Sequence, residues 1–135
     1  MACIFCDILD GTRNGHIVYE DKDHIAFLDK YPIDNGHTLV IPRKHHEKIT
    51  DMDPNDVGKI FSLIPKIAKA VLAGSGADAF SLAQNNGKAA KQIIPHVHIH
   101  IIPRYNNKGT VWTKRQIPSD DMLSELAAKI RSALI

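Results

Sequence analysis

The chain has 135 residues, of which 44% are hydrophobic and 24% are charged, the ordinary balance of one globular domain covering residues 1–135. A chain of this length buries roughly two-thirds of its unfolded surface, so one hydrophobic core is expected to stabilise it. Seventeen Lys and Arg against fifteen Asp and Glu leave a net charge of +2, which argues against a long nucleic acid as partner. The unusual features are two cysteines and eight histidines, and function is expected to lie among these ten residues.

The chain contains no apolar run near the ~20 residues that a membrane-spanning helix needs. Its start, MACIFCDILDG, lacks the basic and sustained apolar segments of a secretory signal, so we expect a cytoplasmic protein with no membrane partner. The spacing of Cys3 and Cys6 allows a small strained disulfide, metal ligation or redox chemistry. Other residues are needed to separate these alternatives.

The first half of the chain predicts three strands and one long helix. Residues 16–30 have the pattern of two short strands about a turn, and residues 38–42 predict a buried strand that ends at its proline. A helix is expected to begin where Asp53 caps Pro54, and it continues with an apolar face at helical spacing. Pro65 is expected to kink or loosen this helix.

The second half predicts two more strands and a last helix. Gly74 and Gly76 are expected to end the long helix, residues 79–84 return as a strand, and residues 96–102 alternate between histidine and apolar residues. Ser119 can cap the last helix. Its buried stripe is expected to comprise Met122, Leu123, Leu126, Ile130 and Ala133. Together these elements predict an α+β fold, an antiparallel sheet of about five strands with one long central helix and a C-terminal helix.

The strand at residues 96–102 carries three histidines at alternate positions. Residues two apart in a strand point to the same face, so His96, His98 and His100 are expected to line one surface, roughly 6.6 Å apart. Three aligned imidazoles are a poor solvated face, since they repel one another when charged. The row therefore indicates a functional face.

Two kinds of chemistry suit such a row. A neutral imidazole can attack phosphorus or a carbonyl carbon while its neighbours orient it and assist the leaving group. Alternatively, spaced imidazoles on a strand can chelate a catalytic metal ion. The second reading is weaker because no carboxylate accompanies the strand.

The histidine motif and several segments around it resemble the histidine triad (HIT) family of nucleotide hydrolases and transferases, in its zinc-containing form. The resemblance extends over nearly the whole chain, in the family's order and spacing. The segments are CIFCDIL (3–9), YEDKDHIAFLD (19–29), GHTLVIPRKH (36–45), Asn85-Asn86-Gly87 and HVHIHIIPRY (96–105).

The resemblance implies a catalytic triad of His96, His98 and His100. In the family the middle histidine, here His98, attacks the α-phosphate of a nucleotide ester, anhydride or phosphoramidate and forms a covalent nucleotidyl-histidine, which water then cleaves. His100 would contact the phosphate and help the leaving group to depart. Main-chain amides of residues 91–93 would stabilise the phosphate, so the chemistry would require no cofactor.

The resemblance also implies a purine nucleotide site. Asp29 matches the carboxylate that holds both ribose hydroxyls, although an Asp at the end of a strand also suits a turn. His37 matches a histidine that supports the triad. Residues at the base slot are Phe5, Ile8 and Phe27, which also suit a core, and residues near the phosphate are Asn85, Gln92 and His100.

Two departures from the family pattern concern specificity. Ile93 stands three residues before the triad, where many purine phosphoramidases of the family carry a serine, so the resemblance leaves the preference for phosphoramidates open. Residues 11–15 lack the family's frequent Ile-Pro, which leaves one wall of the base slot undefined.

A structural zinc ion is also implied by the resemblance. Two cysteines are half of a closed tetrahedral site, and zinc-containing members complete it with two histidines. Here these are His45 and His96, together with Cys3 and Cys6; His46 is the competing neighbour, and a basic solvated turn is the alternative. The remaining histidines outside these groups, His16 and His24, belong to no constellation.

Three classes of function follow. The first is a nucleotide hydrolase or nucleotidyl transferase, the second a nucleotide-binding regulatory protein with weak catalysis, and the third a metal-dependent hydrolase. Family members usually form homodimers that join two sheets and pair the long helices, which here makes residues 53–73 a candidate interface. The segment at Trp112 could then approach the partner's active site through Lys114 or Arg115.

Overall fold

The sheet of this computed structural model, which describes residues 3–113 and 117–134, has five strands in the order β1-β2-β3-β5-β4. All neighbouring strands are antiparallel, as predicted. The strands are β1 (Ile17–Glu20), β2 (His24–Leu28), β3 (Thr38–Pro42), β4 (Ala79–Gln84) and β5 (Ile99–Arg104). The predicted hairpin, buried strand and return strand are confirmed. Lys114 and Arg115, expected near a partner's site, lie outside the described residues.

The histidine strand is the element that sequence reasoning placed wrongly. Regular pairing begins only at Ile99, because the preceding segment bonds elsewhere: the N–H of Val97 donates to the carbonyl of His46 at 2.8 Å. The predicted alternation holds where the strand is regular, since Ile99 and Ile101 lie in the main core. Only His100 of the three histidines lies within β5.

The long helix runs as two segments, α2 (Pro54–Ser62) and α3 (Ile64–Ser75), with Leu63 between them. This break confirms the expected effect of Pro65. The helix ends at Gly76, which has the left-handed φ of 75° that glycine adopts readily, whereas Gly74 lies inside α3. The last helix, α4 (Asp120–Ser132), begins at Ser119 as predicted, and its Ser119 Oγ accepts from the N–H of Met122.

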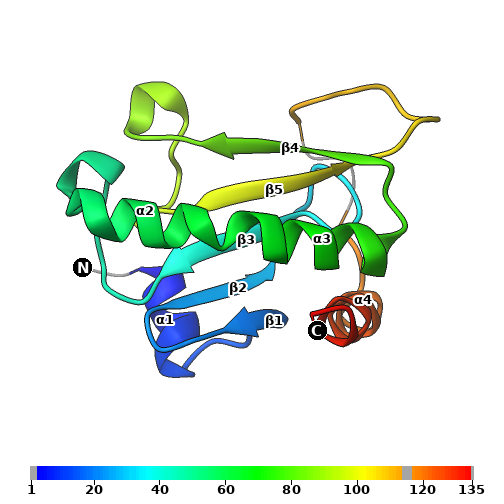
Figure 1. Ribbon diagram of the computed structural model, residues 1–135, viewed down its shortest axis with the longest axis horizontal. Coiled ribbons are helices and arrows are strands. Elements are labelled where there is room, and N and C mark those ends of the chain that lie inside the picture. Colours follow the sequence, from blue (N-terminus) through cyan, green and yellow to red (C-terminus); the bar gives the residue numbers. More distant parts are fainter. Residues whose placement is uncertain (1–2, 114–116, 135) are drawn as a thin grey trace.

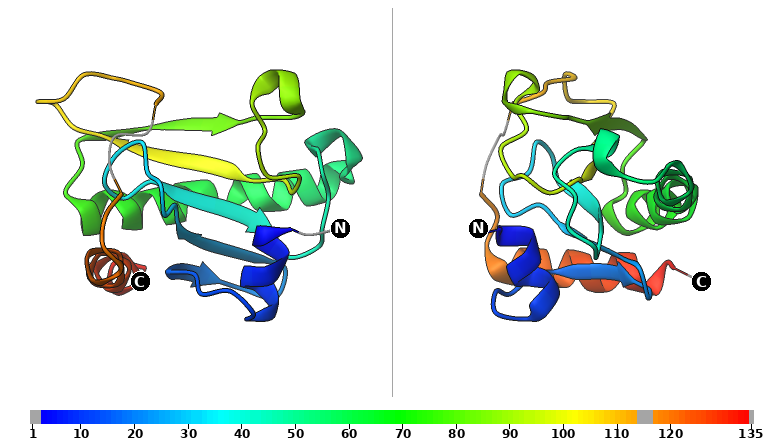
Figure 2. Two further views of the ribbon diagram at one scale, coloured as in Figure 1. Left: turned by 180° about the vertical axis from the view of Figure 1, so that it is seen from behind. Right: turned by 90° about the vertical axis from the view of Figure 1, so that its left-hand side faces the viewer.

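Helices cover the two faces of the sheet unequally (Figures 1 and 2). Helices α2 and α3 cross one face, α4 lies near the β1 edge, and the short helix α1 (Ile4–Asp10) lies on the other face. Alternating strand residues divide accordingly: Ala26 and Leu28 join the helix-side core, and Ile25 and Phe27 pack with α1. The residues of α4 that are buried are Leu123, Leu126, Ala127 and Ile130.

The expected burial of Met122 is wrong, since its side chain is 52% exposed. Ala127 takes the place in the buried stripe that Met122 was expected to fill, because residues 123, 126, 127 and 130 share one side of a helix. Among the described residues, no helix is long and apolar enough to cross a membrane.

Candidate functional site

Two cysteines and two histidines from distant parts of the chain come together beside the start of α1. Their ligand atoms, those of Cys3, Cys6, His45 and His96, all lie within 4.8 Å of one another. His96 Nδ1 is 3.6 Å from both sulfurs, and His45 Nδ1 is 3.2 Å from the sulfur of Cys6. Cys3 and Cys6 are free thiols in this structure. Thiols and imidazoles in a group of four are the donor set of a closed tetrahedral zinc site.

Helix α1, which the sequence reasoning did not foresee, positions the two thiols. Cys3 caps the helix, and its sulfur accepts from the N–H of Cys6 at 3.4 Å. Burial, a hydrogen bond with Cys3 and nearby negative charge raise the pKa of Cys6 to about 11. A bound cation would reverse this balance and favour the thiolates, so the residues fit a metal ion.

The imidazole of His96 belongs to this cluster, with its Nδ1 directed at the two sulfurs. It is completely buried, and burial lowers its pKa to about 4, with a smaller contribution from His45. The hydrogen bond to Pro42 acts in the opposite direction. His96 is therefore neutral at neutral pH, which is the form that ligates metal ions.

His98 and His100 remain side by side, with ring centroids 4.8 Å apart. His98 Nδ1 lies 2.7 Å from the main-chain oxygen of His96, and its ring packs edge-on against Phe5, 5.0 Å between centroids. Phe5 also packs on Phe27, so the apolar residues expected at a base slot adjoin the histidine pair. Phe5 and Phe27 are nonetheless buried among core residues, and Ile8 is partly buried beside them.

His37 supports His100 directly. His37 Nε2 lies 2.9 Å from His100 Nδ1, while His37 Nδ1 accepts from the N–H of Ile33 at 3.0 Å. Asp29 follows β2, and its Oδ2 lies 3.8 Å from His37 Nε2. The predicted ribose-binding carboxylate, supporting histidine and triad histidine thus form one cluster. The hydrogen bond from Ile33 to His37 was not predicted, because every residue except proline has a main-chain N–H and the residue type gives no sign of its partner.

The loop before the triad differs from expectation. The amide of Gln92 is occupied by main-chain groups: its Oε1 accepts from Gly87 and its Nε2 donates to the carbonyl of Glu47. The N–H groups of Lys91 and Gln92 donate within the loop, to Lys88 and Gly87. These hydrogen bonds stabilise the loop, and the Gln92 amide and the two N–H groups are already used within the protein.

The other two residues of the expected phosphate region have different surroundings. Asn85 directly follows Gln84, the last residue of β4, whose partner on β5 is Ile99, the residue after His98. Ile93, at the position where the family often has serine, is 80% exposed.

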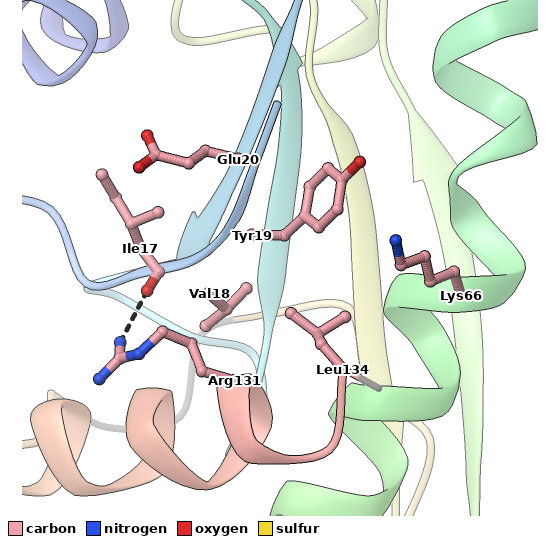
Figure 3. A pocket seen from close by; sticks show the side chains of 7 residues that line it. All are labelled: Ile17, Val18, Tyr19, Glu20, Lys66, Arg131 and Leu134. Carbon is pink, nitrogen blue, oxygen red and sulfur yellow. Dashed lines mark hydrogen bonds between the residues drawn. The ribbon is translucent and has the colours of Figure 1, made fainter. Parts of the chain in front are cut away.

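An open pocket of about 330 Å³ lies at the far edge of the sheet, among β1, α3 and the end of α4 (Figure 3). Its lining includes Tyr19, Lys66 and Arg131, and Arg131 donates to the carbonyl of Ile17 at 2.8 Å. None of its lining residues is a histidine or a cysteine. This pocket therefore does not mark the candidate site, which consists of the clustered histidines and cysteines.

Comparison with known proteins identifies the family. The model of the HIT domain matches residues 11–107. An uncharacterized HIT-like protein of Methanocaldococcus jannaschii is 39% identical over 127 residues, covering 92% of this chain and 98% of that protein. The chain belongs to the HIT domain family, as its motifs predicted.

Two curated relatives have names that state an activity. The adenylylsulfatase of Arabidopsis thaliana is 35% identical over 137 residues, covering 98% of this chain and 69% of that protein. The adenosine 5′-monophosphoramidase of Schizosaccharomyces pombe is 34% identical over 137 residues, covering 97% and 100%. Nucleotide hydrolase activity is thus represented among its relatives.

Solved structures agree with the fold. A hypothetical histidine triad nucleotide-binding protein of Sulfolobus tokodaii has a TM-score of 0.90 at 32% identity, covering 98% of this chain and 91% of that chain. A Zn-bound histidine triad family protein of Mycobacterium smegmatis has a TM-score of 0.88 at 36% identity, covering 99% and 94%. The predicted α+β architecture is confirmed.

Proposed function

We propose that this protein is a nucleotide hydrolase or nucleotidyl transferase that uses His98 as a nucleophile at the α-phosphate. The observation that carries the proposal is the 2.7 Å contact of His98 Nδ1 with the carbonyl oxygen of His96. A carbonyl oxygen only accepts, so Nδ1 carries the proton and the lone pair is on Nε2, the nitrogen that can attack phosphorus.

The reaction would proceed in two displacements. Nε2 of His98 attacks the α-phosphorus of a nucleoside phosphoramidate or a dinucleoside polyphosphate, and the bond to the leaving group breaks. Water then attacks the nucleotidyl-histidine and returns the electron pair to Nε2. The positive charge on the imidazole of the intermediate is stabilised by the His96 carbonyl, which accepts from Nδ1.

The remaining residues of the site would hold a purine nucleotide. Asp29 would accept from the ribose hydroxyls, and Asn85 and His100 would contact the phosphate. The base would lie against the apolar group of Phe5, Ile8 and Phe27, which adjoins His98. His96 would contribute through its main chain and not through its ring.

A zinc ion would have a structural role, held by Cys3, Cys6, His45 and His96. With four protein ligands the ion would keep no open position for substrate. It would tie α1 to the segment before β5. This arrangement disfavours a catalytic metal bound by all three triad histidines, because His96 and His100 face different partners.

A homodimer would join two copies through the exposed edge strand β4. Phe80 and Leu82 on this strand are 38% and 45% exposed, and Phe61 of α2 is 37% exposed. An uncovered apolar edge strand is a favourable surface for pairing with a second copy. Sedimentation velocity on Leu82→Lys would test this interface, since a charge there should favour the monomer.

The alternative is a nucleotide-binding regulatory protein with weak catalysis. It would use the same ribose and base residues but would not need His98 as a nucleophile. His98→Ala separates the two. For an enzyme we expect turnover to fall by about 10⁴-fold, and an adduct of one nucleoside monophosphate to be trapped in the wild type by acid quench and mass spectrometry. His16→Ala, remote from the triad, is the matched control. Unchanged turnover in His98→Ala would exclude the covalent mechanism.

A further inference from the structure

The open pocket at the far edge of the sheet combines apolar side chains with charged ones (Figure 3). Val18 is buried, and Leu134, which follows α4, is half-buried. The volume of about 330 Å³ lies within the range of small-molecule sites, roughly 300 to 1,000 Å³. The pocket adjoins β1, the edge of the sheet opposite to β4, through which the proposed homodimer would form.

Two cationic side chains from different helices line the pocket. The ammonium of Lys66, on α3, lies 5.0 Å from the centre of the Tyr19 ring. Because an aromatic ring carries no net charge, this contact positions the ammonium and leaves its positive charge in place. On α4, Arg131 donates to the carbonyl of Ile17 at 2.8 Å, a contact that uses one of the five N–H donors of a guanidinium. Neither contact neutralises a cation.

The acidic side chain of the pocket is paired elsewhere. Glu20 is the one acidic residue among the described residues of the lining, and its carboxylate lies 3.2 Å from Arg43, which is not part of the lining. Glu20 is thus directed to Arg43 and not to Lys66 or Arg131. Two cations against one anion give the lining a net charge of +1. A ligand with one negative charge and an apolar body would complement this pocket in charge and in polarity.

We propose that this pocket is a second binding site of the protein, for small carboxylates with an apolar body, such as short-chain fatty acids. The carboxylate would bind Lys66 and Arg131, and the apolar chain would lie against Val18 and Leu134. One carboxylate balances the net charge of the lining, whereas a phosphate dianion would exceed it. The inference does not depend on the proposed function, since the lining includes no histidine and no cysteine.

The first test compares hexanoate with two matched ligands by methyl NMR titration at neutral pH. The methyl groups of Val18 and Leu134 report on the pocket, and those of Ile8 report on the apolar group beside His98. We expect hexanoate to shift the pocket methyls at millimolar concentration and to leave Ile8 unchanged. Acetate lacks the apolar chain and hexylammonium has the opposite charge, so each should bind at least about tenfold more weakly.

Three outcomes of this titration would overturn the proposal. The first is that hexanoate shifts no methyl group of the pocket at millimolar concentration. The second is that it shifts Ile8 as strongly as Val18 and Leu134, which would indicate unspecific binding to apolar surface. The third is equal affinity for hexanoate and hexylammonium, which would exclude recognition of the carboxylate.

The second test reverses one charge of the pocket. Lys66→Glu changes the net charge of the lining from +1 to −1, so hexanoate should bind at least about tenfold more weakly and hexylammonium should bind in its place. Lys69→Glu is the matched control, because Lys69 is an exposed lysine of the same helix outside the lining. It should retain the preference for hexanoate. Equal weakening in both variants would assign the effect to the charge of the whole protein and overturn the site.

Hexyl phosphate tests the class of ligand. It has the same chain as hexanoate and close to two negative charges at neutral pH. We expect it to bind no more tightly than hexanoate, and binding about tenfold tighter would overturn the assignment to carboxylates. None of these measurements uses turnover, so a protein without hydrolase activity that binds hexanoate in this pocket would refute the proposed function and support the second site.

Discussion

The Nε2 of His96 lies 2.8 Å from the carbonyl oxygen of Pro42, the last residue of β3. This contact places the ring proton on Nε2 and directs the lone pair of Nδ1 toward Cys3 and Cys6. The main-chain oxygen of the same residue accepts from His98. His96 thus links the cysteine cluster to the proposed nucleophile.

Removing one thiol should abolish metal binding. We expect Cys3→Ser to reduce the zinc content from about one ion per chain to near zero, measured by elemental analysis, and to lower the melting temperature. Zinc at a thousand times its Kd stabilises a folded chain by about 4 kcal/mol, which the variant would lose. His46→Ala, outside the four-residue cluster, is the matched control and should retain zinc. Full zinc content in Cys3→Ser would contradict the assignment.

Asp29→Asn should remove discrimination between ribose and deoxyribose. Hydrogen bonds from hydroxyls to a carboxylate contribute about 1.5 to 3 kcal/mol, so the Kd for AMP should rise by at least tenfold. Calorimetry with AMP and 2′-deoxy-AMP measures this. The wild type should distinguish the two nucleotides and the variant should not. If Asp29→Asn still binds AMP more tightly than 2′-deoxy-AMP, residues other than Asp29 bind the ribose hydroxyls.

Gly74→Ala should destabilise the contact between α3 and α4. A Cβ at this position would lie 2.7 Å from the Ile130 side chain and 2.8 Å from its main-chain nitrogen, which cannot move aside alone. We expect a loss of about 1–3 kcal/mol in the free energy of unfolding by urea. Gly58→Ala in α2 is the matched control, because its Cβ would meet nothing within 4 Å. It should be neutral or stabilising, by up to about 1 kcal/mol.

Stability should fall in acid partly through Asp21. Burial tends to raise the pKa of this carboxyl, but hydrogen bonds from Tyr19, Asp23 and His24 outweigh it and lower the pKa from 3.8 to about 2. Since the folded-state pKa is lowered, the contribution is complete above pH 4 and is lost as the pH falls toward 2. It amounts to at most about 2 kcal/mol, less after solvent screening of a side chain that is 32% exposed.

Urea titrations of Asp21→Asn at several pH values check this contribution. The variant should be less stable than the wild type at neutral pH and should lose less stability between pH 4 and 2. Asp23→Asn, an exposed carboxyl in the same turn, should behave like the wild type. If the free energy of unfolding depends on pH in the same way in the wild type and in Asp21→Asn, Asp21 does not cause the loss of stability in acid.

Local patterns in the chain were sufficient for most of the fold. Three local patterns act through neighbouring residues: Asp53 before Pro54, Ser119 before an apolar stripe, and the apolar run of residues 38–42. Their elements therefore formed where expected. Helix α1 was missed because its stability depends on Phe5 packing against Phe27 and on the capping sulfur of Cys3. Met122 was misplaced because an apolar residue beside a stripe is buried only if a partner lies over it.

The sequence by itself determined the family, the antiparallel sheet and the candidate residues for chemistry, since these depend on residue types at short spacings. Only the tertiary structure decided which groups each histidine contacts. His96 turns to the cysteines because His45 and Pro42, distant in sequence, lie beside it, and His100 receives a hydrogen bond from His37. The proton positions depend on a main-chain oxygen and a main-chain N–H, groups that every residue has and that only the fold brings to a particular ring.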